Sequence, residues 1–299
     1  MKKIGNMKKA LVAAAIISLS TTGAAFASGA GDAASFDPQK NIGVVSREDG
    51  SGTRGAFIEL FGIEVRGADG SRRDTTTKEA VIAKQTDVMM MNIAGDAYAI
   101  GYISLGSLNE TVKAVAVNGV AATTANVKNG SYTVSRPFYI ATKGEAAESA
   151  LTKDFIGFIL SAEGQGVIAK SYIPVNTAAA PYAGSKPAGK IVIAGSSSVT
   201  PVMEKLKEAY NALNPSAVIE IQMSDSSAGM TAALDGACDI GMSSRDLKDS
   251  ELARLTPVKI AIDGIAVIVN KKNPVANLTK DEIKAVFTGE TARWSQVIK

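Results

Sequence analysis

The sequence predicts an α/β fold in which helices cover the faces of a sheet. Apolar runs rich in β-branched residues, typical of buried strands, recur at 191–193, 218–221 and 265–269. Patterns typical of helices separate these runs, and such alternation is characteristic of helices packed on a largely buried sheet. With 299 residues, of which 46% are hydrophobic, the chain is long and apolar enough to form a large core.

Three segments carry the clearest helical patterns. Apolar residues recur every three or four positions from Pro201 to Leu213, and proline suits the first turn of a helix. A second helix is expected over 152–170. A third is expected over 279–287, with Thr279 as N-cap and Glu282 completing a capping box.

The first 27 residues have the three parts of a secretory signal. Four lysines precede an apolar stretch at 10–19, which is too short to span a bilayer, and Ala25-Phe26-Ala27 ends the segment. We expect cleavage after Ala27 and export to the periplasm or the extracellular face of the cytoplasmic membrane. Because no cysteine lies near this position to carry a lipid, we expect no lipid anchor.

Charge and composition exclude several classes of function. Removing the four lysines of the signal leaves 28 basic residues against 29 acidic ones, so no nucleic-acid partner is expected. The chain contains no histidine, which excludes Ser-His-Asp catalysis and histidine-ligated zinc. We therefore expect neither enzyme activity nor a metal or other cofactor.

Two stretches rich in Ala, Gly, Ser and Pro, 28–40 and 177–189, are predicted to be linkers. The second overlaps a sequence, 184–190, that is similar to a nucleotide-binding phosphate loop. However, Ile191 stands where such a loop needs a Mg²⁺-binding Ser or Thr, and a strand follows where a helix is required. Nucleotide binding is not expected there.

Three motifs place Ser, Thr and Gly where a helix is expected to begin: 46–53, 195–201 and 225–229. A helix start exposes unpaired N–H groups and the positive end of the helix dipole, and glycine lets an anion approach the backbone. Each motif alone is also explained by N-capping. Together, and with Arg47 available for a bidentate contact, they favour a site for a small tetrahedral oxyanion. The alternative role of Arg47 is an ion pair with Asp49.

At these motifs the sequence resembles the phosphate-binding protein of the phosphate-specific ABC transporter. The resemblance extends through 94–104, 134–138 and 240–245, and it covers nearly all of 41–176 and 190–299. The order of segments differs from the usual order of that family, because the segment with which members normally finish comes first here. This is the pattern of a circular permutation, with 177–189 joining the usual termini.

The resemblance implies a two-lobed periplasmic-binding-protein-like fold of type II, with a hinge of two crossing strands near 134–140 and 265–269. One lobe would combine 136–176 with 190–270, and the other would combine 41–135 with 271–299. The implied function is binding of inorganic phosphate by a monomer and its delivery to an ABC permease and the ATPase of that permease. Open alternatives are a phosphate sensor or scavenger, a binder of sulfate, and a phosphoesterase using Ser51 or Thr53, which the absence of histidine disfavours.

Carried over by position, the resemblance implies a set of phosphate-binding residues. At Ser244 some family members have an aspartate that accepts the proton of hydrogen phosphate, so its absence leaves discrimination against sulfate open. Either Asp49 takes that role, or Ser244 donates to the anion. The full set of expected site residues is Arg47, Asp49, Ser51, Gly52, Thr53, Ser198, Val199, Thr200, Ser227 and Ser244, with main-chain N–H groups at Gly52 and Val199.

Overall fold

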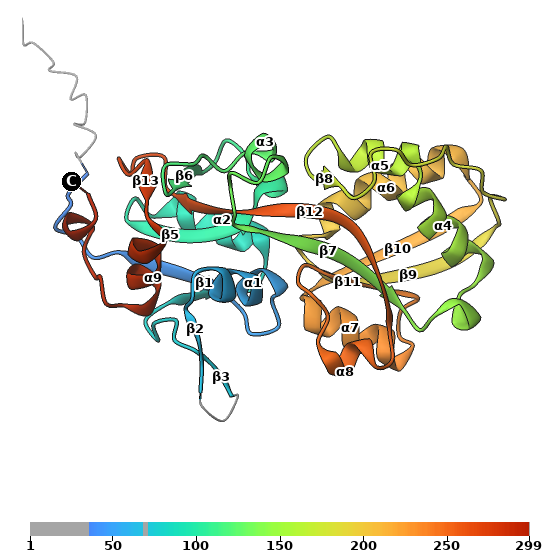
Figure 1. The fold of residues 1–299 in the computed structure, drawn as a ribbon, viewed down its shortest axis with the longest axis horizontal. Coiled ribbons are helices and arrows are strands. Elements are labelled where there is room, and N and C mark those ends of the chain that lie inside the picture. Colours follow the sequence, from blue (N-terminus) through green and yellow to red (C-terminus); the bar gives the residue numbers. More distant parts are fainter. Residues whose placement is uncertain (1–35, 68–70, 299) are drawn as a thin grey trace, which may run out of the picture. The chain divides into compact units, whose positions relative to one another are not determined.

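Two antiparallel strands, β7 (Ser135–Thr142) and β12 (Thr256–Val269), connect two lobes (Figure 1). The computed structural model describes residues 36–67 and 71–298, so the predicted signal and most of the first predicted linker lie outside the described residues. The main sheet has the order β10-β9-β11-β7-β12-β5-β1-β4. The predicted α/β fold with two crossing strands is therefore confirmed.

Lobe 1 is built on strands at one end of this sheet. Parallel β9 (Gly189–Ser196) lies between β10 (Ala217–Ser224) and β11 (Ile240–Ser243). The other elements of lobe 1 are α4 (Ala150–Leu160), α5 (Ala162–Ile168), β8 (Ile173–Pro174), α6 (Thr200–Leu213), α7 (Ser226–Asp235), α8 (Asp249–Leu252) and the 3-10 turn η2 (Glu145–Ala147).

Lobe 2 is built around β1 (Gly43–Arg47), which pairs in parallel with β5 (Ala99–Ser104) and β4 (Val81–Ala83). In a separate two-stranded sheet, β2 (Glu64–Arg66) pairs in antiparallel with β3 (Arg72–Asp74). The other elements of lobe 2 are α1 (Gly52–Leu60), α2 (Thr86–Gly95), β6 (Lys113–Val117), α3 (Thr124–Lys128), β13 (Asn277–Leu278), α9 (Lys280–Thr288) and the 3-10 turns η1 (Leu105–Ser107) and η3 (Trp294–Gln296).

Each lobe has its own hydrophobic core. Residues of 44–134 and 265–297, with Ile173, form the core of lobe 2, whereas residues of 138–261 form two clusters in lobe 1. Strand β12 thus passes from the core of lobe 1 into the core of lobe 2 near Gly264. The resemblance implies a lobe boundary after Asn270, and that boundary stays a prediction.

Two of the three predicted helices are confirmed nearly as expected. Helix α6 has Pro201 in its first turn, and α9 has the Thr279–Glu282 capping box. The prediction of one helix over 152–170 is wrong, because the chain forms α4 and α5 with an extended residue, Ser161, between them. The Ser161 hydroxyl donates to the carbonyl oxygen of Phe158 and accepts from the N–H of Gly164, so it ends one helix and caps the next.

The segment 177–188 contains no helix or strand, but it packs along lobe 1. The Asp154 carboxylate of α4 accepts hydrogen bonds from the Tyr182 hydroxyl, from the Ser185 N–H at 2.8 Å and from the Tyr210 hydroxyl at 2.6 Å. Burial opposes ionisation of Asp154, but these hydrogen bonds outweigh it and hold its pKa below the ordinary value of 3.8. The carboxylate is therefore an anchor for this segment.

Replacing Asp154 with Asn is expected to lower the free energy of unfolding by about 1 to 3 kcal/mol at neutral pH, since hydrogen bonds to a charged acceptor weaken. Because the folded pKa of Asp154 lies below the unfolded value, this stabilisation is present above pH 3.8 and is lost as the pH falls through the folded pKa. Urea unfolding as a function of pH measures it. Lys153→Ala, on the exposed neighbour, is the control. A gap between wild type and variant that persists in acid would contradict the prediction.

Candidate anion-binding site

The starts of α1, α6 and α7 meet between the lobes. Helix α1 begins after Ser51, whose hydroxyl accepts from the N–H of Arg54 at 3.3 Å. Helix α7 begins after Asp225, which accepts from the N–H of Ala228 at 2.8 Å, whereas the start of α6 has no side-chain cap. Each start directs the positive end of a helix dipole at the boundary between the lobes.

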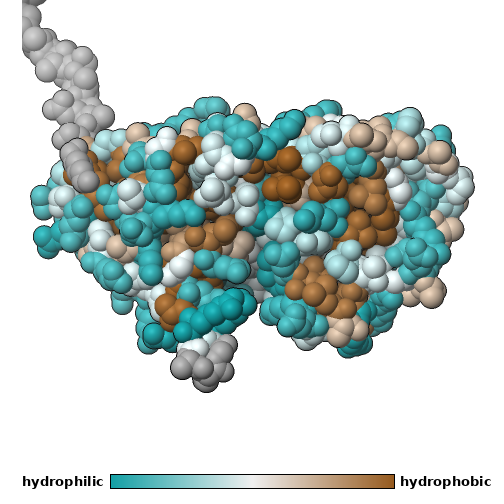
Figure 2. All heavy atoms as spheres, viewed as in Figure 1, coloured by the Kyte–Doolittle hydropathy of each residue, from teal (hydrophilic) through white to brown (hydrophobic). Residues whose placement is uncertain are grey.

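Hydroxyl groups of the two lobes touch at this boundary. The Thr53 Oγ1 and Ser198 Oγ atoms lie 2.7 Å apart, and both residues are buried. Thr86, at the start of α2, lies 3.3 Å from the Ser197 Oγ and 3.5 Å from the Ser198 Oγ. Hydrophilic residues border the notch between the lobes at the lower edge of the space-filling view (Figure 2).

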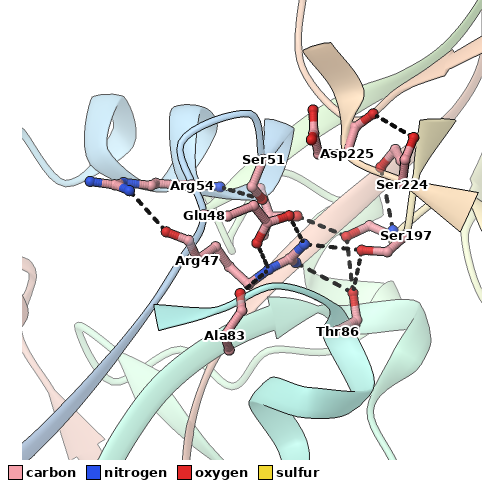
Figure 3. A network of polar contacts seen from close by, with 12 residues as sticks. Arg47, Glu48, Ser51, Arg54, Ala83, Thr86, Ser197, Ser224 and Asp225 are labelled. Atoms are coloured by element: carbon pink, nitrogen blue, oxygen red, sulfur yellow. Dashed lines mark hydrogen bonds and ion pairs between the residues drawn. The ribbon is translucent and has the colours of Figure 1, made fainter. Parts of the chain in front are cut away.

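Arg47 reaches this group of hydroxyls from lobe 2 (Figure 3). The side chain is 1% exposed, and its Nη2 donates to Ser197 Oγ at 3.0 Å. Its Nε and Nη2 also hold the Glu48 carboxylate at 2.8 and 2.7 Å. A buried guanidinium needs such partners, since burying an unpaired charge is costly.

The backbone at Arg47 is fixed by Tyr102 of β5. The Tyr102 hydroxyl accepts from the Arg47 N–H at 3.1 Å and lies 2.9 Å from the Ser46 Oγ. Its ring stacks on Phe57 of α1, with centroids 3.8 Å apart. Burial raises the pKa of Tyr102, which therefore stays a neutral hydrogen-bonding group. Tyr102 therefore ties the end of β1 to the middle of α1.

Three further serines of lobe 1 lie beside the start of α1. Ser196 Oγ donates to Ser244 Oγ at 2.9 Å, and the Ser244 N–H donates to Ser226 Oγ at 3.1 Å. All three are buried. Arg136 of β7 donates from its Nη1 to Ser244 Oγ at 3.2 Å. The site thus combines many hydroxyl donors with two guanidinium groups.

The structure brings Arg47, Gly52, Thr53, Ser198 and Ser244 of the predicted set together in this cluster. The other predicted residues are placed differently. The N–H of Val199 and the hydroxyl of Thr200 both donate to the carbonyl oxygen of Ser196, and Ser51 caps α1. Ser227 is half-buried, accepts from Arg245 at 3.1 Å and donates from its N–H to the Gly50 carbonyl oxygen at 3.2 Å.

Asp49 does not enter the cluster. Its side chain is fully exposed and pairs with the Arg54 Nη1 at 2.6 Å, so the alternative role of Arg47, an ion pair with Asp49, is not what the structure shows. Glu48 is the carboxylate that pairs with Arg47 instead. The two residues are neighbours in the sequence, and their spacing alone does not tell which side chain turns inward.

Sequence reasoning missed five residues of the cluster. Ser196, Ser197 and Ser226 lie within two of the quoted motifs, but the motifs do not indicate which hydroxyls face the boundary between the lobes. Thr86 had only the weak signal of a hydroxyl at a helix start, and Arg136 lay in a segment quoted for the resemblance. Within the described ranges, no group of three His, Cys, Asp or Glu side chains is placed to hold a metal ion. None of the described helices has the length and apolar character needed to cross a membrane.

Comparison with known proteins identifies close relatives. A family model described as a PBP superfamily domain matches residues 28–163 and 180–299. Phosphate-binding protein PstS 2 of Streptococcus agalactiae is 51% identical over 273 residues, which cover 91% of this chain and 92% of that protein. Phosphate-binding protein PstS 2 of Streptococcus pneumoniae is 43% identical over 257 residues, which cover 86% of this chain and 87% of that protein.

One solved structure similar to this chain is also a phosphate-binding protein. It is a phosphate-binding protein of a phosphate ABC transporter from Streptococcus pneumoniae, with a TM-score of 0.68 and 43% identity over 86% of this chain and 100% of that chain. Since the sequence alignments run in one direction along nearly the whole of both chains, these relatives share the order of segments found here. The circular permutation relative to other members stays a prediction. The chain therefore belongs to the PBP superfamily and, within it, to the family of PstS phosphate-binding proteins of ABC transporters.

Proposed function

We propose that this protein binds inorganic phosphate between its lobes, outside the cytoplasmic membrane, and delivers it to an ABC permease and the ATPase of that permease. The observation that carries the proposal is the buried group of hydroxyls from both lobes, with Thr53 and Ser198 in contact and Arg47 beside them. The names of the relatives support phosphate as the ligand. No catalytic role is proposed for these residues.

The chemistry of the cluster fits a tetrahedral oxyanion. Hydroxyls and main-chain N–H groups donate in several directions, and four oxygens of one anion accept in several directions. The N–H groups of Gly52 and Thr53 open α1 and have no partner within the helix. An anion there would accept from these groups and from the hydroxyls that now bond to one another.

Two glycines at the start of α1 let lobe 2 approach lobe 1 closely. A side chain added at Gly52 would place its Cβ 2.4 Å from the Ser226 Oγ and 2.7 Å from the Ser244 Oγ. At Gly50 the added Cβ would lie 2.2 Å from an oxygen of Asp225. These positions lack positive φ angles, so here glycine serves the approach of the two lobes rather than an unusual backbone conformation.

Alanine variants distinguish residues that bind phosphate from residues that only cap helices. Ser198→Ala and Thr53→Ala are each expected to weaken phosphate binding about 10-fold or more, because each removes a buried hydrogen-bonding group that faces the ligand. Thr279→Ala, which removes the capping hydroxyl of α9 far from the cluster, should cost about 1 kcal/mol of stability and leave the affinity unchanged. Calorimetry on the phosphate-stripped protein measures the affinities.

Two outcomes would overturn the proposal. Clear binding of sulfate with no heat from phosphate would make the substrate assignment wrong. A protein that binds phosphate tightly, yet restores no uptake in a strain lacking its native binding protein, would be a sensor or scavenger rather than a transport protein.

A substitution at Gly52 tests whether the two lobes must close on the ligand. Gly52→Ala should weaken phosphate binding by at least about 10-fold, because the new methyl group keeps α1 away from Ser226 and Ser244. Gly55→Ala, one turn later in the same helix, is the matched control, since its Cβ would meet nothing closer than Arg245 Cδ at 3.8 Å. Equal affinities for the two variants in calorimetry would contradict closure at Gly52.

A further inference from the structure

A buried ion pair lies on the two strands that connect the lobes. Arg136 of β7 and Asp263 of β12 are direct neighbours in the strand register, and their Nη2 and Oδ2 atoms lie 3.2 Å apart. Both side chains are almost completely buried. Burying two charges is costly, and well-packed apolar residues often serve stability equally well. The pair therefore calls for an explanation beyond stability.

Asp263 is held on several sides. Its Oδ1 accepts from the N–H of Gly106 at 3.3 Å, and Ser104 and Tyr172 also face it. Burial raises the pKa of Asp263 to about 6, although Arg136 opposes the rise, and burial lowers the pKa of Arg136 to about 10. At neutral pH both groups are charged, so the carboxylate fixes the guanidinium in place.

The other arm of Arg136 reaches the cluster. Its Nη1 donates to Ser244 Oγ at 3.2 Å, and Ser196 Oγ donates to the same atom at 2.9 Å. A serine oxygen has two lone pairs, and these two donors occupy both. The Ser226 Oγ lies 3.4 Å away, so it is the acceptor of a long hydrogen bond from the Ser244 hydroxyl. A ligand at the start of α1 could replace this long hydrogen bond, because Ser244 Oγ lies beside Gly52.

We propose that Arg136, held by Asp263, is a positioning residue of the anion site that makes Ser244 a hydrogen-bond donor toward the ligand. This inference rests on the proposed function. Arg136 acts through Ser244 and does not touch the anion itself. Since Ser244 donates, it does not accept a proton from the ligand, and it contributes at least as much to binding of the dianion of phosphate as to binding of the monoanion.

A double-mutant cycle tests the coupling. The neutral replacement Arg136→Met with Asp263→Asn removes both charges and keeps an oxygen for the Gly106 N–H. We expect it to weaken phosphate binding about 10-fold, and Ser244→Ala to do the same. Combining all three changes should weaken binding no more than Ser244→Ala alone, within about twofold, because one interaction has been removed in each case.

The controls separate this role from a structural one. Lys259→Met removes a positive charge from an exposed position on the same strand, β12, and should leave the affinity unchanged. Thermal unfolding establishes that each variant is folded. If the neutral pair does not fold, Arg136→Lys repeats the cycle, since an ammonium group lacks the fork that reaches Asp263 and Ser244 together.

The readouts distinguish failure of the inference from failure of the proposed function. Losses that multiply, or no loss from the pair replacement, would refute the positioning role while wild-type phosphate binding stands. No phosphate binding by the wild type would refute the proposed function. Calorimetry below and above the second pKa of phosphate, both above the pKa of Asp263, adds a further check. Ser244→Ala should weaken binding at the higher pH by at least the factor found at the lower pH, and a larger factor at the lower pH would reveal an acceptor.

Discussion

The contact between Thr53 and Ser198 is the interaction on which this architecture depends. It joins the starts of two helices from different lobes in a place from which water is largely excluded. Buried donors cost free energy unless an acceptor meets them, and the positive ends of three helix dipoles add to the demand for negative charge. The hydroxyls of the cluster can donate or accept, whereas the N–H groups that open α1 can only donate. An anion at this point would therefore stabilise the approach of the two lobes.

Strands β7 and β12 connect the lobes that form this cluster, and Arg136 of β7 extends to Ser244 within it. Strand β12 contributes to both hydrophobic cores, so the lobes share one continuous element. Asp263 and Arg136 lie where the two strands pair, and Arg136 extends from there to Ser244. A change at the hinge is thereby linked to the direction of a hydroxyl in the site. Phosphate binding and lobe closure would then be two aspects of one equilibrium.

Local signals in the sequence predicted local structure well. The capping box of α9 and the proline at the start of α6 depend on neighbouring residues only, and both were predicted. The helix starts at the three motifs rich in Ser, Thr and Gly were predicted for the same reason. The break at Ser161 was missed because a serine in an apolar pattern can continue a helix or cap the next one. Arg136 and Thr86 join the cluster through pairing of distant segments, which no local pattern encodes, and the inward turn of Glu48 rather than Asp49 is decided by packing.

A crystal structure of the protein with phosphate bound is the most direct measurement of the central claim. The account predicts one tetrahedral anion within hydrogen-bonding distance of the Thr53 and Ser198 hydroxyls and of the N–H groups that open α1, with Arg47 donating to it. An anion held by one lobe only, or bound away from Thr53 and Ser198, would contradict the account.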